Sequence, residues 1–555
     1  MRVLTIALFF GCFGCVSSGP SISATDHVVD VSGPTLFDVS TLIENEDSGR
    51  LVDLADASVL DAGTPDVMPD TLVPIDDFHI TFNARVVEPG QDLNLGVIDQ
   101  YEQISLQLEV MNVGSTDLTV RPEHGDGLIL GLDTEIQMNL PPGERLILAF
   151  LLNTERAESS LSVPLVIRVT GAGRRVFECT LSASIQPHIR DEAPANPNFK
   201  SALEGILNES GLVGIAAAVV RGTEIIAIEG AGFADREQLI PVDPRVTRFR
   251  WASVAKSMGA VVALRSQRVR IDTSITDYFP TYQVPDVYLP PGCRQIECAR
   301  PLTAEERHIT LRQLLSHRAG IQHYTNGVAN PTPPTREIND PAVNDGIEWA
   351  IEYFVSNPLI AKPGTTYAYS SFGYNLMGVV LEHALEDTYE HLVQTQIGDT
   401  LGMQTLEADR FWQPIPNRAV GYRFSGGSVV RDSDTDVSWK LPGGGFISTI
   451  VDLARYCGGL QSDVLLSPML RESVLFNDYF DQNYALGLGV GTSGGRRLIS
   501  HTGAQQKAAS SIRLYPDEGL CIVMMSNTRP DVSRDGFDSA GAIGRRVDAA
   551  WRALE

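Results

Sequence analysis

Near the middle of the 555-residue chain the sequence reads Phe249-Arg250-Trp251-Ala252-Ser253-Val254-Ala255-Lys256-Ser257-Met258-Gly259. Ser253 and Lys256 are three residues apart, so at the start of a helix they share one face. A serine hydroxyl is a weak nucleophile until a neighbouring base takes its proton, and a desolvated lysine can act as that base. The same spacing also describes a capping serine followed by a surface lysine. The pair therefore predicts a nucleophile only if other motifs accompany it.

Further motifs follow this pair in order along the chain. They are Leu314-Leu315-Ser316-His317, then Tyr369-Ser370-Ser371, then Gly443-Gly444-Gly445-Phe446-Ile447-Ser448-Thr449, and finally His501-Thr502-Gly503. Together these segments resemble the serine beta-lactamase and penicillin-binding-protein-like superfamily, in particular the serine hydrolases related to class C beta-lactamases. The resemblance extends over residues 197–555.

The resemblance implies a role for each matching residue. Ser253 would attack the substrate carbonyl and become acylated, while Lys256 acts as general base and shares its proton with Tyr369. His501 would exchange protons with Tyr369 or orient a substrate carboxylate. The backbone N–H groups of Ser253 and Ala504 would form the oxyanion hole. Further contacts with substrate or with the oxyanion are expected from Ser371, Thr502, Gly503 and Ala504. We expect neither a cofactor nor a metal site.

Three positions depart from the superfamily pattern. Ser371 stands where an asparagine is usual, and its side chain lacks the reach of an amide toward Lys256. His501 replaces a lysine and is a weaker cation near neutral pH. The run 505–507, Gln-Gln-Lys, stands where relatives often carry glycine, so we expect a different strand edge beside the substrate. The first two departures favour an esterase or peptidase over efficient lactam recognition.

Two histidines, His317 and His323, lie close together in the sequence. A metal site is one interpretation, but no third ligand is apparent, so packing beside the active site is favoured. The segment Gly320-Ile321-Gln322-His323-Tyr324 resembles the mitochondrial beta-lactamase-like serine peptidases, which favours peptide substrates.

The N-terminus has the pattern of an export signal. Arg2 precedes an apolar run that is too short to span a bilayer as a helix. A glycine comes directly before Cys12 and again before Cys15, as at a bacterial lipoprotein processing site. We expect residues 1–18 to be a signal peptide with lipidation at Cys12 or Cys15, and ordinary secretion is the alternative.

Residues 19–77 are strongly acidic. The whole chain has a formal net charge of −26, and a balance of −12 falls between Asp26 and Asp77, where Arg50 is the only Lys or Arg. Such a segment buries too little apolar surface to offset the entropy lost on ordering. We therefore predict a disordered linker. The acidity also argues against a nucleic-acid partner, which calls for a basic face.

Residues 78–190 change to short runs of alternating polarity. The runs 104–110, 146–152 and 163–169 are typical of strands, and turn signals separate them at the spacing of a β-sandwich. The segment resembles the Ig-like modules of bacterial surface proteins. We expect an Ig-like β-sandwich that serves as a spacer or adhesion module.

Residues 197–555 mix helical and strand patterns. The runs 213–220 and 224–230 predict an antiparallel pair, 510–515 and 520–527 predict another, and 538–554 predicts a terminal helix. The resemblance implies a beta-lactamase/transpeptidase-like α/β (α+β) domain with a central antiparallel sheet flanked by helices. The protein is thus expected to be multidomain.

Seven cysteines are too few to define the fold. Cys293 and Cys298 lie five residues apart in an insertion and are expected to form a disulfide if the protein is exported. Cys179, Cys457 and Cys521 have apolar neighbours, and small buried side chains are the favoured interpretation for these three.

The leading hypothesis is an exported serine hydrolase that cleaves an ester, amide or peptide bond. A D,D-carboxypeptidase or beta-lactamase is the second hypothesis, and an inactive adhesion lipoprotein is the third. The expected location is the bacterial cell envelope or surface, through an N-terminal lipid, and the expected partner is a small-molecule or peptide substrate. Protein partners are not predicted.

Overall fold

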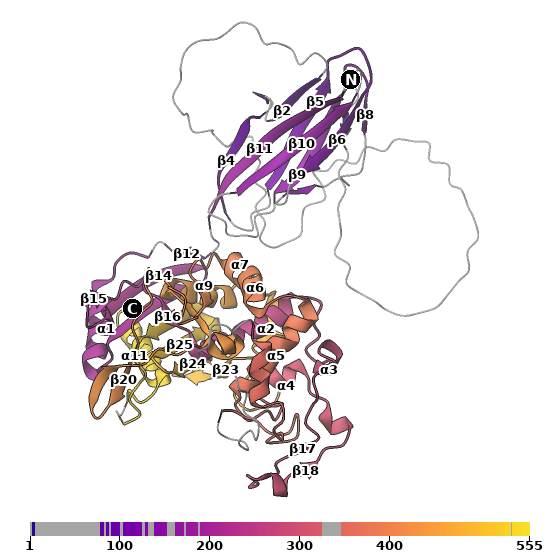
Figure 1. Cartoon of the computed structure of the whole chain (residues 1–555). Coiled ribbons are helices and arrows are strands. Elements are labelled where there is room, and N and C mark those ends of the chain that lie inside the picture. The colour runs from indigo at the N-terminus through magenta and orange to yellow at the C-terminus, as the bar shows by residue number, and fades with distance from the viewer. Residues whose placement is uncertain are drawn as a thin grey trace. The chain divides into compact units, whose positions relative to one another are not determined.

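The computed structural model describes residues 3–5, 78–82, 85–87, 90–99, 104–124, 128–130, 138–152, 161–170, 174–186, 189–191, 193–324, 346–533 and 536–555. The chain divides into two compact units, Met1–Gln186 and Pro187–Glu555 (Figure 1). Both predicted lipidation sites, Cys12 and Cys15, and the acidic segment 19–77 lie outside the described residues. The predictions for them stay predictions.

The described residues of the first unit form two β-sheets. One sheet has the order β1 (Val3–Thr5), β9 (Arg145–Leu152), β5 (Ile104–Asn112), β2 (Phe78–Phe82), β3 (Arg85–Val86), with β7 (Leu128–Leu130) beside β9. The other has the order β4 (Asp92–Asp99), β11 (Arg174–Gln186), β10 (Leu161–Thr170), β6 (Leu118–His124), β8 (Met138–Leu140).

Alternation of side chains builds the core of this unit. Val163, Leu165 and Ile167 of β10 are fully buried, and they belong to one hydrophobic cluster with Leu108 and Leu148 of the other sheet. Successive side chains of a strand point to opposite faces, so every second residue enters the core. The three strands predicted from polarity are present, while the assignment to the Ig-like class stays a prediction.

An eight-stranded mixed sheet forms the centre of the second unit. Its order is β12 (Arg190–Asp191), β14 (Glu224–Asp235), β13 (Gly214–Arg221), β26 (Leu520–Ser526), β25 (Ala508–Tyr515), β24 (Arg496–Gln505), β23 (Gly489–Ser493), with β15 (Ile240–Pro241) beside β14. All pairs are antiparallel except β12 with β14. The predicted pairs 213–220 with 224–230 and 510–515 with 520–527 are confirmed.

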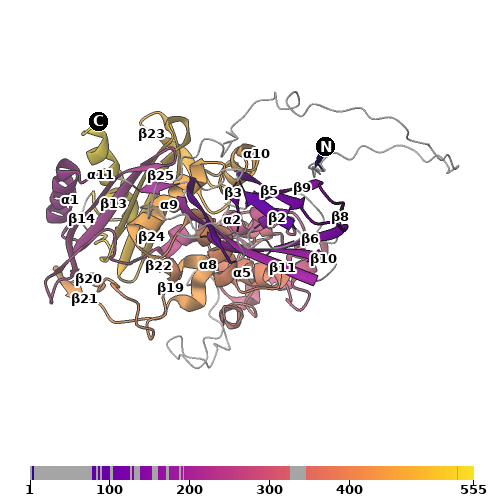
Figure 2. The same cartoon turned by 90° about the horizontal axis from the view of Figure 1, so that it is seen from above.

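Helices cover both faces of this sheet. The terminal helices α1 (Pro197–Ser210) and α11 (Ala540–Arg552) pack together on one face, and α9 (Ile450–Gln461) crosses β13 and β26 on the other. Figure 2 shows α1 and α11 on the opposite side of the sheet from α9 and α2 (Lys256–Arg265). Separate hydrophobic clusters fill the two sides. The predicted terminal helix is therefore present.

Shorter elements surround the sheet. The helices are α3 (Ile275–Tyr278), α4 (Leu311–Leu315), α5 (Ser371–Leu385), α6 (Tyr389–Val393), α7 (Asp399–Leu401), α8 (Leu441–Gly444) and α10 (Pro468–Leu470). Three further small sheets pair β16 (Phe249–Arg250) and β19 (Glu407–Ala408) with β22 (Phe446–Ser448), β17 (Val287–Tyr288) with β18 (Arg300–Pro301), and β20 (Tyr422–Ser425) with β21 (Ser428–Arg431). In the part of the chain that the structure describes, no helix has the length and apolarity to cross a membrane.

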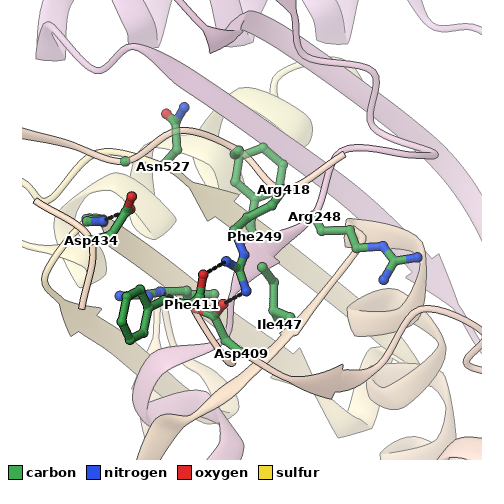
Figure 3. Close-up of a pocket in the computed structure, with 12 residues that line it drawn as sticks. Arg248, Phe249, Asp409, Phe411, Arg418, Asp434, Ile447 and Asn527 are labelled. Atoms are coloured by element: carbon green, nitrogen blue, oxygen red, sulfur yellow. Dashed lines mark hydrogen bonds and ion pairs between the residues drawn. The ribbon is translucent and has the colours of Figure 1, made fainter. Parts of the chain in front are cut away.

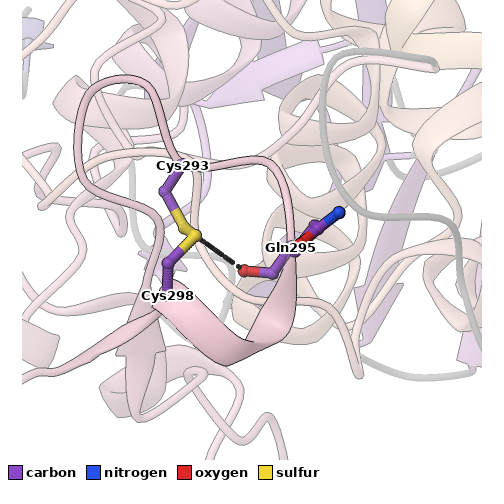
Figure 4. Close-up of a disulfide and its surroundings, with 3 residues drawn as sticks. All are labelled: Cys293, Gln295 and Cys298. Carbon is purple, nitrogen blue, oxygen red and sulfur yellow. Dashed lines mark hydrogen bonds between the residues drawn. A yellow bond between two sulfur atoms is a disulfide. The ribbon is translucent and has the colours of Figure 1, made fainter.

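Two disulfides cross-link the second unit. Cys293 and Cys298 are bonded as predicted, and the Gln295 carbonyl oxygen lies 3.2 Å from each sulfur (Figure 4). Cys457 of α9 is bonded to Cys521 of β26, so the prediction of unpaired buried side chains was wrong for these two. The packing of α9 on β26 joins residues 64 apart in sequence, and a local pattern carries no signal for that. Cys179 is buried and free, as predicted.

Candidate active site

Ser253 lies on a strained turn between a strand and a helix. After β16, Trp251 donates its backbone N–H to the Phe446 carbonyl 2.9 Å away, and the chain then enters a 3₁₀ turn, Ala252–Ala255. Ala252 has a φ of 47°, in the left-handed region that a residue with a Cβ occupies at a cost of about 1–2 kcal/mol. This turn leaves Ser253 half-buried while its neighbours are buried.

Lys256 begins α2 and is completely buried. Its Nζ donates to the Gly443 carbonyl at 2.7 Å and lies within hydrogen-bond distance of two hydroxyls, 3.1 Å from that of Ser371 and 3.2 Å from that of Ser253. No carboxylate pairs with it among the described residues. Burial, and then the positive charge of Lys440, hold the pKa of Lys256 well below its ordinary value. A neutral amine beside a serine hydroxyl can accept the serine proton.

Tyr369 lies on the other side of the serine. Its side chain is hydrogen-bonded to Ser253, and its ring centre is 5.1 Å from the Lys256 Nζ. Burial raises the pKa of Tyr369, so this residue keeps its proton at neutral pH. Tyr369 is therefore suited to relay a proton as a neutral hydroxyl.

Ser371 differs from the sequence-based expectation. We expected its side chain to fall short of Lys256, but the two side chains form a 3.1 Å hydrogen bond. The reason is the approach of two helices: Ser371 is the first residue of α5, and α5 packs against α2. A short hydroxyl therefore suffices where the superfamily usually has an amide.

Two histidines fix the start of α5. The Nδ1 of His317 accepts the backbone N–H of Ser370 at 3.0 Å, and the Nδ1 of His323 accepts that of Ser371 at 3.1 Å. The His317 ring also lies 4.2 Å from the ring of Tyr369. Both histidines thus position the Tyr-Ser-Ser segment. Among the described residues, no group of His, Cys, Asp and Glu has an arrangement that could hold a metal.

His501 also differs from expectation, because both of its ring nitrogens face protein groups. Nε2 lies 3.1 Å from the Tyr484 hydroxyl, and Nδ1 lies 2.9 Å from the Thr502 carbonyl oxygen. A carbonyl only accepts, so Nδ1 carries the proton and Nε2 accepts from Tyr484. Burial lowers the pKa of His501 to about 3. The expected proton exchange with Tyr369 is therefore absent from this geometry.

Strand β24 passes directly beside the turn that carries Ser253. A Cβ on Gly503 would lie 2.6 Å from the Trp251 carbonyl oxygen and 2.8 Å from the Ala252 Cβ, so this approach requires glycine. Pairing of β24 with β23 ends at Ser500, whereas pairing with β25 continues to Gln505. One backbone edge of residues 502–505 thus has no strand partner among the described residues. Thr502 and Ala504 are exposed here.

A buried ionic cluster supports the strand that leads to Ser253. Asp409 is fully buried and pairs with both Arg250 of β16 and Arg418, the latter at 2.6 Å (Figure 3). Arg248 pairs with Glu407 beside them. The three arginines and Asp409 line a cavity of about 30 Å³. Because its charges are paired with one another, we interpret the cavity as structural support and not as the substrate site.

Two residues of the site belong to none of the sequence motifs. Tyr484 precedes β23 and carries no motif, yet its hydroxyl holds His501. Lys440 precedes the glycine segment, and its charge acts on both Lys256 and His323. No spacing rule marks either residue. The described structure brings Ser253, Lys256 and Tyr369 together as the motif order predicted.

Comparison with known proteins agrees with this geometry. Residues 199–542 match the beta-lactamase family, which is more than half of the chain. The chain belongs to the beta-lactamase family.

Two curated relatives are similar to about half of this chain. The serine beta-lactamase-like protein LACTB, mitochondrial, of Bos taurus is 26% identical over 336 residues, covering 49% of this chain and 57% of the relative. Beta-lactamase-like protein 4 of Dictyostelium discoideum is 29% identical over 272 residues, covering 46% of this chain and 44% of the relative. The chain thus spans about half the length of these relatives.

Solved structures of the beta-lactamase fold also superpose on the chain. The D-amino acid amidase from Ochrobactrum anthropi SV3, complexed with L-phenylalanine amide, has a TM-score of 0.50 at 21% identity and covers 65% of this chain and 99% of its own. FmtA from Staphylococcus aureus has a TM-score of 0.50 at 17% identity, over 67% of this chain and 94% of its own. At these identities the likeness shows the fold alone.

Proposed function

We propose that this protein is an exported serine hydrolase that cleaves an ester, amide or peptide bond through an acyl-enzyme on Ser253. The observation that carries the proposal is the buried Lys256 Nζ, 3.2 Å from the Ser253 hydroxyl and without a carboxylate partner among the described residues. A lysine held in this way favours its neutral form and is suited to be a general base.

Acylation needs one base and one relay. Lys256 takes the proton of Ser253 while the serine Oγ forms a bond to the substrate carbonyl carbon. The carbonyl oxygen becomes an oxyanion, and the backbone N–H groups of Ser253 and Ala504 would donate hydrogen bonds to it. The bond to the leaving group then breaks, and the proton reaches that group from Lys256 through the Tyr369 hydroxyl.

Deacylation reverses these steps with water. A water molecule gives a proton to the neutral Lys256 amine, directly or through Tyr369, and its oxygen attacks the acyl carbon. The second tetrahedral intermediate collapses with return of the proton to the Ser253 Oγ. The products are the free acid and the regenerated enzyme, and no cofactor enters the balance.

The site of His501 argues for an esterase or peptidase over a lactamase or D,D-carboxypeptidase. Enzymes of the latter kind would use a cation at this position for the substrate carboxylate. Here both ring nitrogens of His501 face protein groups, and burial keeps the ring neutral. Without a cation at position 501 of β24, the carboxylate of a lactam has no ion-pair partner at this position.

Two disulfides in the catalytic unit support the export part of the proposal. Cys293–Cys298 and Cys457–Cys521 need an oxidising compartment to persist, and reducing cytosol would keep such thiols free. An exported, lipid-anchored chain would meet that condition. We propose the bacterial cell envelope or surface as its location.

The full-length protein should be incubated with a fluorophosphonate probe and with a fluorescent penicillin. The wild type and Ser253→Ala are compared with Ser266→Ala, which removes a hydroxyl from the end of α2, away from the nucleophile. We expect phosphonate labelling of the wild type and of Ser266→Ala, none of Ser253→Ala, and weak penicillin labelling.

Three other outcomes would change the proposal. Stoichiometric penicillin labelling on Ser253 would instead identify the protein as a D,D-carboxypeptidase or beta-lactamase. Absence of both labels from folded wild type would favour a binding protein without activity. Labelling that persists in Ser253→Ala would place the nucleophile elsewhere.

A further inference from the structure

A second pocket lies at the far end of the strand that carries His501. It has a volume of about 260 Å³, and its lining comprises Thr435, Asp436, Val437, Trp439, Lys440, Gln505 and Gln506. Gln505 is the last residue of β24, two positions beyond Gly503. A strand rises about 3.3 Å per residue, so the pocket begins roughly 7 Å along β24 from Gly503. Gly503 lies against the turn that carries Ser253.

Two hydrogen-bond donors at this pocket have no partner. The Lys440 ammonium makes no hydrogen bond or ion pair with any residue that the structure describes; its Nζ lies 5.6 Å from the Tyr324 ring centre and 5.7 Å from that of Trp439. The Nε2 of Gln505 is buried, and within the same described ranges it has no hydrogen-bond partner. Buried donors without partners are uncommon in folded proteins and call for an acceptor.

The acceptor side chains of Asp436 and Gln506 at this pocket are already engaged. Both carboxylate oxygens of Asp436 accept from the Ser438 hydroxyl at 3.0 Å, and one of them also accepts the Ser438 backbone N–H. The Gln506 Oε1 accepts from the Thr435 hydroxyl at 3.0 Å. The charged group that stays without a partner among the described residues of the pocket is therefore a donor, the Lys440 ammonium, with the Gln505 Nε2 as a second donor. An ionised carboxylate, which only accepts hydrogen bonds, complements that set.

Several contacts connect this pocket to the reacting serine. Tyr324, under the Lys440 ammonium, is hydrogen-bonded to Ser371, which in turn contacts Lys256. Lys440 also stands three residues before Gly443, whose carbonyl accepts from Lys256. Strand β24 runs past both Ser253 and the pocket, and Tyr324 and the segment 440–443 connect the two. A single substrate can therefore reach both.

We infer that this pocket is a substrate subsite for a carboxylate group, with Lys440 as the residue that determines specificity and Gln505 as a second donor. The inference rests on the proposed hydrolase function and deepens it, because it names the substrate class: esters, amides or peptides that carry a carboxylate near the scissile bond. This carboxylate position, at the Gln505 end of β24, differs from the position beside His501 at which a lactam carboxylate would be bound.

The charges around Lys440 set the pH range of this recognition. Burial, followed by the charge of Arg250, lowers the pKa of Lys440 to about 8, and Asp436 opposes that change. Lys256 and His323 also lie within range of its charge. The ammonium is therefore mostly charged at pH 7 and mostly neutral at pH 9.5. Attraction for a carboxylate is present below pH 8 and is lost above it.

Two pairs of esters test the subsite. In the first pair the acyl group carries the charge: mono-4-nitrophenyl glutarate is compared with its neutral methyl ester. In the second pair the leaving group carries the charge: 4-carboxyphenyl acetate is compared with phenyl acetate. For each pair the ratio of kcat/KM, charged over neutral, is measured at pH 7 with full-length wild type, Lys440→Met, Lys440→Arg and Lys200→Met. Lys200 is exposed on α1 and serves as the control for loss of a lysine charge.

In at least one pair we expect the wild type to prefer the charged ester tenfold or more, through a lower KM. Lys440→Met should lose that preference, Lys440→Arg should keep most of it, and Lys200→Met should be unchanged. The ratio corrects for any effect of Lys440 on Lys256, because both esters of a pair share the same base. In the wild type the preference should also fall at pH 9.5, which tests the subsite even if Lys440→Met does not fold.

Equal turnover within both pairs, or a preference that survives in folded Lys440→Met, would overturn the inference. Glutarate binding to the wild type, measured by calorimetry beside glutaramide, separates this failure from failure of the proposed function. If no ester is hydrolysed but glutarate binds in a Lys440-dependent manner, the subsite stands and the hydrolase proposal fails. If esters are hydrolysed and glutarate binds no better than glutaramide, the subsite fails and the hydrolase proposal stands.

Discussion

Replacing Lys256 with methionine should abolish turnover and at the same time stabilise the protein against unfolding in alkaline buffer. Methionine has a similar length, so it can fill the same buried space next to Ser371. The loss of activity follows from removal of the base, and general base catalysis contributes about 10²- to 10⁴-fold. The gain in stability follows from the protonation equilibrium of the lysine.

The sign of that gain depends on which state binds the proton. The pKa of Lys256 is lowered in the folded protein, so below its ordinary value of 10.5 the unfolded chain binds a proton that the folded chain does not. Until the pH reaches the folded pKa, each unit of acidification therefore costs the wild type roughly 1.4 kcal/mol relative to the variant. For a unit of this size, Pro187–Glu555, that corresponds to about 2 °C in Tm per pH unit.

Differential scanning calorimetry at pH 9.5 and pH 8.5 measures the effect. The Tm difference between Lys256→Met and wild type should widen toward pH 8.5, whereas Lys200→Met, on an exposed helix face, should follow the wild type. Groups common to both proteins cancel in this comparison. A Tm difference that is the same at both pH values would refute the reasoning, because Lys256 would then titrate alike in the folded and unfolded chain.

Three other predictions concern neighbouring groups. Tyr369→Phe should lower kcat about 10²-fold or more while KM changes little, since the relay for the leaving-group proton is lost; unchanged turnover would remove the tyrosine from the mechanism. Tyr484→Phe should lower the free energy of unfolding by about 1–3 kcal/mol in urea titrations, because the His501 Nε2 loses its donor; a neutral result would mean that another donor replaces it. Cys457→Ala combined with Cys521→Ala should cost about 4 kcal/mol, from the entropy of a 64-residue loop, unless the pair is reduced in the native protein.

The parts of the molecule that obey a local rule were predictable. Ser253 and Lys256 share a face because positions three apart do so in any helical turn, and the order of the later motifs then indicated Tyr369 as their neighbour. The strands β13, β14, β25 and β26 were visible as apolar runs around short turns. In each case the physical cause lies within a few residues of the pattern that reveals it.

The remaining features depend on contacts between distant segments. Ser371 reaches Lys256 because α5 packs close to α2. The distance between two helices cannot be predicted from the sequence of either helix. Tyr484 reaches His501 from the loop before β23, and Cys457 reaches Cys521 through the packing of a helix on a sheet. From residue type alone, such side chains are expected only to pack in the core. Only tertiary structure reveals which polar groups become partners.

In the proposed mechanism, the hydrogen bonds of Lys256 also determine when Ser253 becomes reactive. Its three hydrogen-bond partners are Ser253, then Ser371 more than a hundred residues later, and Gly443 beyond that. Before these segments meet, the lysine is hydrated and protonated, and the serine is no more reactive than any other. The growing chain is thus latent while it is synthesised, and labelling of Ser253 measures the fraction of molecules that have completed folding.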